Sequence, residues 1–174
     1  MRIVLIAHFF IINLFQKEDP NLFVKDEYIY EIKEDSLYLF CDNKVDYCSK
    51  ELLINNDNID FSKYHILNFD NIYFYKKTGG LLYQLIDNEI TRIDNSYDHK
   101  LHTGSLSFFH NDQINILGGY GFFNRRDDII YFSKENKEWF SKDIKGDFPI
   151  EGISEINFHA IIEDNLIFCG GLTN

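Results

Sequence analysis

The sequence contains almost no alanine, and no segment repeats apolar residues at the spacing of an amphipathic helix. In place of helix formers it has 17 Phe and 11 Tyr, together with many Ile. Aromatic and β-branched residues of this kind favour strands. Short apolar runs, such as 28–32 and 81–86, alternate with polar turns. The sequence therefore predicts an all-β protein.

Several familiar motifs of catalytic and cofactor sites are also missing. The double glycines lack the pattern of a phosphate-binding loop, no G-x-S-x-G occurs, and no cysteine pair has the spacing of zinc ligands. The net charge of −11 comes from 17 basic and 28 acidic residues and opposes binding to nucleic acid. We therefore assign no catalytic residue, cofactor, metal or nucleic-acid partner.

One weak metal-binding pattern has a simpler interpretation. His99 and His102 are three residues apart and Asp98 adjoins them, which are ligand types that suit zinc or copper. On an extended chain, residues three apart point to opposite faces. We interpret this stretch as a loop between sheets, without a metal.

The longest apolar run lies at the N-terminus, over residues 3–15. At about 13 residues it suits the apolar part of a signal peptide and is short for a membrane span of about 20 residues. The alternative is a buried first strand, and His8 and Asn13 interrupt the run. We predict a signal peptide over 1–15, hence export, and no membrane span because no second long apolar run follows.

A repeated unit is visible between Asp112 and Trp139. An apolar run, 114–117, ends at Gly118-Gly119, and a polar loop, 120–128, leads to a second run at 129–132. The opening of this unit recurs 52 residues along, at Asp164 to Gly171. A repeat of that length with a few strands in each unit predicts a β-propeller.

These residues resemble the kelch repeat, in which a glycine pair closes an apolar strand and an aromatic residue precedes a Trp by seven positions. The resemblance implies that such a pair ends the second strand of each blade, and that the Tyr or Phe and the Trp pack between blades. His159 fits a histidine that bonds to the backbone near a first strand, whereas His102 lies further from its strand and does not fit that register. The repeat positions are Gly118, Gly119, Phe132, Trp139, His159, Gly170 and Gly171. The best repeat covers 101–150, and the next begins at about 155.

The upstream chain follows the repeat less closely. The segments that begin at Asp35 and Asp70 are like those at Asp112 and Asp164, but they have no glycine pair at the matching position. Gly79-Gly80 lies slightly later in the chain. A hairpin over 81–94 fits strands three and four of a degenerate blade, and 49–63 reads as a loop. The alternative is that these segments are not blades, because any all-β protein contains such strands by chance. We predict that 16–174 holds about three blades and the start of another, in an open arc rather than a closed ring.

The long loop after the first glycine pair is the candidate binding loop, because loops on a rigid scaffold commonly bind. It contains Tyr120, Phe122, Phe123, Arg125 and Arg126. Two adjacent arginines can grip a carboxylate or phosphate, although a solvated loop is the simpler interpretation.

Three cysteines remain to be placed. Cys41 and Cys48 can form a local disulfide if the chain is exported. Cys169 reads as a structural residue of a core strand.

The resemblance implies a non-catalytic interaction module that presents loops to a protein or glycan partner. The remaining blades would come from a longer chain or from self-association. Two alternatives stay open: a fragment of a carbohydrate-active enzyme of the oxidase or mutarotase type, and a truncated remnant. The oxidase needs a copper set of two Tyr and a His with a thioether-forming Cys, which we cannot place in this sequence.

Overall fold

The structure is a computed structural model that describes residues 22–25, 28–33, 36–41, 48–52, 59–87, 89–143, 145, 151–156, 158–162 and 165–172. These residues form strands β1 to β16 and one short 3-10 helix, Phe61–Lys63, which Asp60 caps by accepting from the Ser62 N–H. Every strand pair is antiparallel. The prediction of an all-β chain is confirmed.

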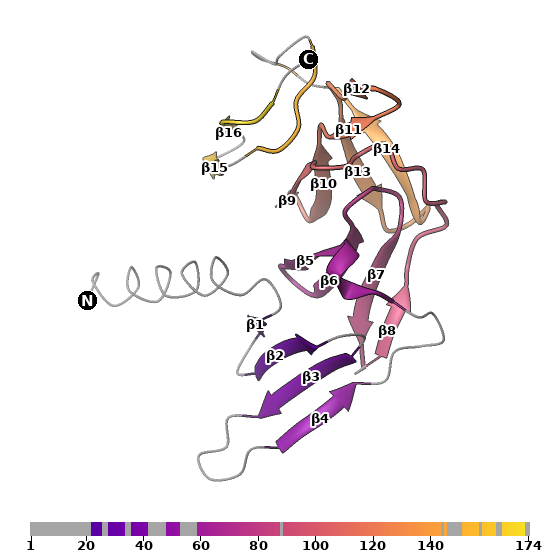
Figure 1. The fold of residues 1–174 in the computed structure, drawn as a ribbon, viewed down its shortest axis with the longest axis vertical. Helices are drawn as coiled ribbons and strands as arrows, with labels where there is room; N and C mark the ends of the chain where they lie inside the picture. The colour runs from indigo at the N-terminus through magenta and orange to yellow at the C-terminus, as the bar shows by residue number, and fades with distance from the viewer. Residues whose placement is uncertain are drawn as a thin grey trace, which may run out of the picture.

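Apart from one separate two-stranded hairpin, the strands form four sheets, which Figure 1 shows in succession along the long axis of the molecule. The first sheet is β1 (Leu22–Lys25), β2 (Tyr28–Lys33), β3 (Ser36–Cys41) and β4 (Cys48–Leu52). The second is β5 (Tyr64–Asn68), β6 (Ile72–Lys76), β7 (Leu82–Ile86) and β8 (Glu89–Arg92). In both sheets each strand pairs with the next one along the chain.

The third sheet follows the same path with one excursion. It consists of β9 (Leu106–His110), β10 (Gln113–Leu117), β13 (Ile129–Ser133) and β14 (Glu138–Lys142). Between β10 and β13 the chain forms a separate two-stranded hairpin, β11 (Tyr120–Gly121) and β12 (Asn124–Arg125). The fourth sheet has two described strands, β15 (Phe158–Ile162) and β16 (Asn165–Cys169).

Two upstream expectations need correction. The segment opened by Asp35 was aligned with the second strands of the repeat, but it forms β3, the third strand of its sheet. The interpretation of 49–63 as a loop is wrong for its first residues, because β4 pairs with β3 over Leu37↔Leu52 to Cys41↔Cys48. Pairing with a neighbouring strand overrides the low strand propensity of Ser49 to Glu51.

The apolar core is organised by the second sheet, which is buried on both faces. Successive residues of β6 alternate between two clusters, as the side-chain period of a strand requires. Ile72 and Phe74 belong to a cluster with the 3-10 helix residue Phe61. Tyr73 and Tyr75 belong to the other cluster, which also contains third-sheet residues: Ile114, Ile116, Ile130 and Phe132. The second and third sheets therefore share one core.

Candidate functional site

Three glycine pairs mark the same end of three consecutive sheets, each directly or shortly after the second strand. These pairs are Gly79-Gly80 after β6, Gly118-Gly119 after β10 and Gly170-Gly171 after β16, and all six residues have positive φ. The segments that lead into the next sheet, 97–105 and 151–155, run against the glycines. We call the surface made by these pairs, these two segments and the hairpin β11–β12 the glycine face.

Close backbone approach explains why glycine stands at the middle pair. A Cβ on Gly118 would lie 2.2 Å from the Ile153 carbonyl oxygen, and one on Gly119 would lie 2.6 Å from the His102 Cα. The Gly119 N–H donates to the same Ile153 oxygen at 2.7 Å. Both incoming segments thus meet at this pair, which no residue with a side chain would allow.

His102 is the buried polar residue at this junction, with 3% of its surface exposed. Its Nδ1 lies 2.8 Å from the Gly118 carbonyl oxygen, so the neutral tautomer donates from Nδ1. Burial lowers the pKa of His102, and the hydrogen bond to Gly118 opposes that effect only in part. A neutral ring therefore ties the segment before β9 to the end of β10.

The ring of His99 lies against that of His102, with centroids 5.4 Å apart. The expectation that the two side chains point to opposite faces is therefore wrong, because 93–102 is not a regular strand. Asp98 is turned toward the second sheet instead, where Lys76 donates to it at 2.6 Å and Thr78 at 3.1 Å. Within the described part of the chain, no group of three or more His, Cys, Asp or Glu side chains is arranged to hold a metal ion.

The two adjacent arginines of the loop are held by different partners. Arg126 forms a double hydrogen bond with Asp128, at 2.7 and 3.3 Å, and this contact raises the pKa of Arg126. Arg125 donates from Nε to the Ser154 hydroxyl at 3.1 Å, and its guanidinium lies 6.0 Å from the centre of the Tyr120 ring. They do not form one joint anion clamp.

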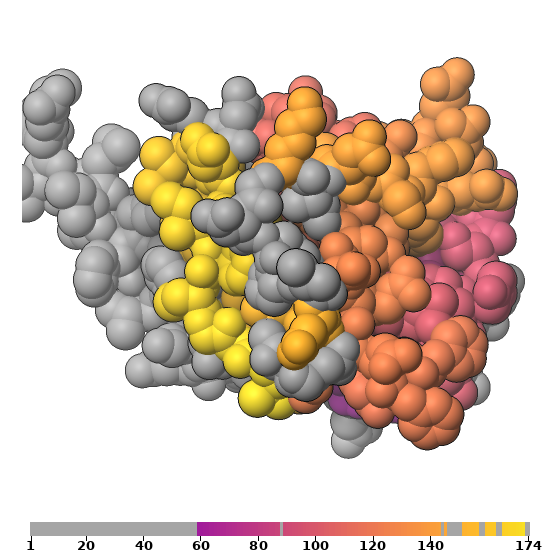
Figure 2. Space-filling model, turned by 90° about the horizontal axis from the view of Figure 1, so that it is seen from above, coloured from indigo at the N-terminus to yellow at the C-terminus, as the bar shows by residue number. Residues whose placement is uncertain are grey.

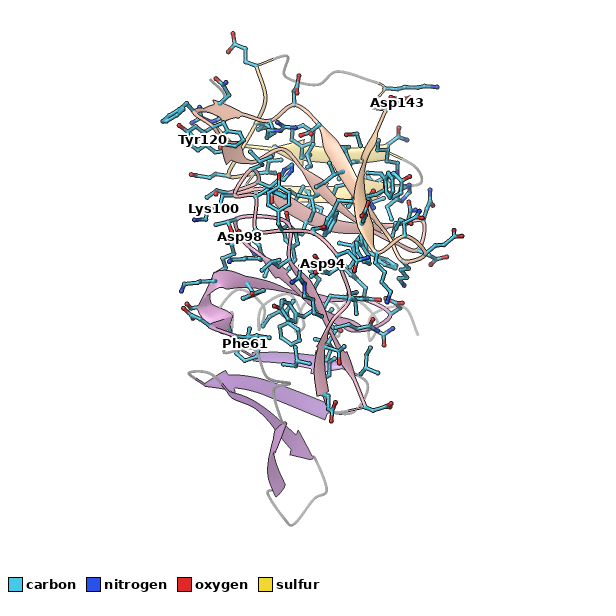
Figure 3. The ribbon with its side chains drawn as sticks, turned by 90° about the vertical axis from the view of Figure 1, so that its right-hand side faces the viewer. Phe61, Asp94, Asp98, Lys100, Tyr120 and Asp143 are labelled. Atoms are coloured by element: carbon cyan, nitrogen blue, oxygen red, sulfur yellow. The ribbon has the colours of Figure 1, made fainter. Side chains whose placement is uncertain are left out.

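The predicted binding loop contains a tight hairpin that the sequence did not indicate. Tyr120 pairs with Arg125 and Gly121 with Asn124, so Phe122 and Phe123 form its two-residue turn. These two phenylalanines are 76% and 91% exposed. Tyr120 is 42% exposed beside them, and the loop thus presents three aromatic rings to solvent. Figure 3 shows Tyr120, Lys100 and Asp98 along one side of the molecule.

The remaining repeat positions are placed as follows. Trp139 is half-buried at the shared core, 5.3 Å from Tyr75 and 5.3 Å from Phe132 by ring centroids, and its Nε1 donates to the Gly80 carbonyl at 2.9 Å. His159 lies within β15 and is exposed. The buried histidine that bonds a backbone carbonyl is His102, although it lies further from its strand, β9, than the resemblance implies.

The fold and this face define an all-β chain of successive antiparallel sheets whose loops gather at the glycine pairs. No protein-family model and no curated protein matches the chain. Among solved structures, it is similar to the structure of YjhT, with a TM-score of 0.52 and 12% sequence identity over 76% of this chain and 51% of that one. At this identity the likeness shows the fold alone. The chain matches about half the length of that structure.

Proposed function

We propose that the chain is part of a kelch-type β-propeller. Each four-stranded sheet is one blade, β15 and β16 begin another, and the described blades form an open arc rather than a closed ring. Two observations support the proposal: the recurrence of a glycine pair after the second strand, and the position of Trp139 between the second and third sheets. Alternate sides of each blade are then buried against its neighbours.

The proposed function is a non-catalytic interaction module that presents the loops of the glycine face to a protein or glycan partner. The observation that carries this proposal is the exposed aromatic hairpin, with Tyr120, Phe122 and Phe123 beside Arg125. Aromatic residues and arginine are enriched at binding surfaces because they contribute large contact areas and directed hydrogen bonds. The hairpin stands on a rigid junction of sheets, as binding loops commonly do.

An array experiment tests this function. The purified 174-residue chain is applied to arrays of glycans and of extracellular proteins, with a heat-denatured sample as the control. Saturable binding that needs the folded chain supports the proposal. Binding no stronger than that of the denatured control, or turnover of an arrayed sugar without stable binding, would contradict it.

Export is the proposal about location. The apolar run 3–15 motivates it and lies outside the described residues. Within the described part of the chain, the structure has no helix long and apolar enough to cross a membrane. N-terminal sequencing of the protein from cells able to process it is the measurement. A mature chain that lacks residues 1–15 is expected, and a cytoplasmic chain that still begins at Met1 would refute export.

A further inference from the structure

The turn of the hairpin β11–β12 uses residues that its backbone disfavours. Phe122 and Phe123 have φ of 49° and 68° in a two-residue hairpin loop, the pattern of a type I′ turn. Bulky residues rarely adopt positive φ, and Asn, Asp and Gly normally fill such turns. The turn between β9 and β10 follows this rule, because Asn111 and Asp112 form it with φ of 51° and 57°. The double phenylalanine therefore works against local stability.

Contacts with the rest of the glycine face hold both arms of the hairpin in place. Thr103 and Tyr120 exchange two backbone hydrogen bonds, of 3.1 and 2.7 Å. A Cβ on Gly121 would lie 2.5 Å from the Leu101 Cα, so the hairpin sits directly on the segment before β9. On the other arm, Arg125 donates to Ser154. The turn is thus fixed before any partner arrives, which lowers the entropy cost of binding.

The shape and charge of the hairpin tip indicate what kind of partner binds it. A convex pair of rings at 76% and 91% exposure cannot enclose a ligand, so a partner must supply the concave surface. Two of the four arginines of the chain lie in this loop, and the backbone carbonyl of the exposed Lys100 lies under Gly121. Asp128 offsets Arg126, and Asp127 is the exposed acid of the loop, so the two arginines and two aspartates balance at the tip of a chain of net charge −11.

This charge balance favours a protein over a membrane. An anionic bilayer repels a chain of net charge −11 and needs a cluster of several cations to overcome that repulsion. A protein pocket needs only local complementarity, because a few carboxylates at its rim can face Arg125 and Lys100.

We propose that Phe122 and Phe123 are an anchor that inserts into an apolar pocket, rimmed by carboxylates, on a protein partner. This inference rests on the proposed interaction function and names its partner class. It explains why two phenylalanines stand at positive φ. Their exposed rings are needed to bind the partner, although they strain the backbone of the turn.

The double substitution Phe122→Asn with Phe123→Gly separates binding from folding. It installs the preferred residues of a type I′ turn, so the melting temperature should stay the same or rise. A structural role for the rings would instead lower it. Phe140→Ser is the matched control, since Phe140 is an exposed aromatic residue, 38% accessible, on β14 rather than on the hairpin.

Photocrosslinking finds the partner in the cells that make the chain. A benzophenone amino acid replaces Phe123 in one sample and Phe140 in the other, and the linked peptides are sequenced. We expect position 123 to link one protein at apolar residues that neighbour Asp or Glu. That purified partner should then bind the double variant at least about thirtyfold more weakly than the native chain, as for an interface hot spot, and should bind Phe140→Ser normally.

Three outcomes of the partner and vesicle experiments would overturn the inference. The first is a crosslink at position 123 no stronger than at position 140, and the second is unchanged affinity of the partner for the double variant. The third is phenylalanine-dependent flotation with vesicles of phosphatidylcholine and phosphatidylserine, which would assign the tip to a membrane. Array binding that survives the double substitution would contradict this inference alone. Absence of any array binding would contradict the proposed function as well.

Discussion

At the scale of single residues, Trp139 links two sheets by two different interactions. Its ring contacts Tyr75 of the second sheet and Phe132 of its own, and its indole N–H satisfies the Gly80 carbonyl. The ring area and the hydrogen bond stabilise the same junction. A residue of this kind is best tested by removing the two contributions separately.

Trp139→Ala should lower the free energy of unfolding by about 3–5 kcal/mol, because it removes a large aromatic ring from a sheet-to-sheet core. Trp139→Phe keeps most of the ring and loses the hydrogen bond to Gly80, so its cost should be about 1 kcal/mol. Urea denaturation measures both values. Equal and small effects of the two variants would mean that Trp139 does not join the sheets.

His65 on β5 should make stability depend on pH. Burial, with Lys77 nearby, lowers its pKa from 6.5 to about 4. Since the unfolded chain binds the proton more readily, stability is lost as pH falls from 6.5 toward 4, by at most about 3 kcal/mol. Burial lowers the pKa values of His99 and His102 in the same direction.

The comparison of His65→Gln with the native chain isolates this contribution. The variant should show a shallower loss of unfolding free energy between pH 7 and pH 5 in urea titrations. Parallel profiles for the two proteins would mean that His65 has the same pKa in the folded and unfolded states.

At the scale of elements, the hairpins differ in how completely the sequence specifies them. The turn Asn111-Asp112 has residues suited to positive φ, and the register His110↔Gln113 follows from it. The hairpin β11–β12 has no such signal, and contacts with Thr103 and Ser154 impose it. The hairpin β3–β4 pairs two cysteines across its strands.

Cys41 and Cys48 are direct partners across β3 and β4. Opposed residues of an antiparallel pair have Cα atoms about 4.5–5.5 Å apart, which is within the range of a disulfide. In an exported chain we expect this bridge to form and to add roughly 2 kcal/mol of stability. Mass spectrometry after alkylation without reductant should find one modified cysteine, Cys169, which is exposed on β16 and is not the core residue that the sequence suggested. Three modified cysteines from an oxidising compartment would exclude the bridge.

At the scale of the whole molecule, the last described sheet differs from the two before it. β6 and β10 each pair with strands on both sides, whereas among the described residues β16 pairs only with β15. Figure 2 shows this C-terminal segment in yellow on one side of the molecule, seen from above. Three of its isoleucines are exposed: Ile161, Ile162 and Ile167. An apolar edge strand of this kind is a template for association.

The 174-residue chain expressed alone should therefore be marginally stable and should self-associate through 160–169. Ile167→Lys places a charge on this edge and should shift the population toward monomer, while Ile86→Lys, an exposed position at the end of β7, should not. Size-exclusion chromatography with light scattering gives the masses. A stable native monomer with a sharp cooperative melt would favour a chain that closes its own core, and a compact sandwich or barrel would replace the propeller proposal.

The sequence by itself determined the features that depend on neighbouring residues. Aromatic and β-branched runs specify strands, and the hairpin of β7 and β8 follows from the turn at Asp87. The glycine pairs were visible because close backbone approach and positive φ require that residue.

The tertiary structure decided what depends on residues distant along the chain. The bond from His102 to Gly118, the pairing of β4 with β3 and the left-handed turn at Phe122 and Phe123 are of this kind. In each case the local sequence pattern either does not favour the observed structure or disfavours it. Contacts between separate segments supply the stabilising free energy. Local preferences select the strands, whereas the packing of one sheet and its linker against the next fixes the glycine face and the position of its exposed aromatic tip.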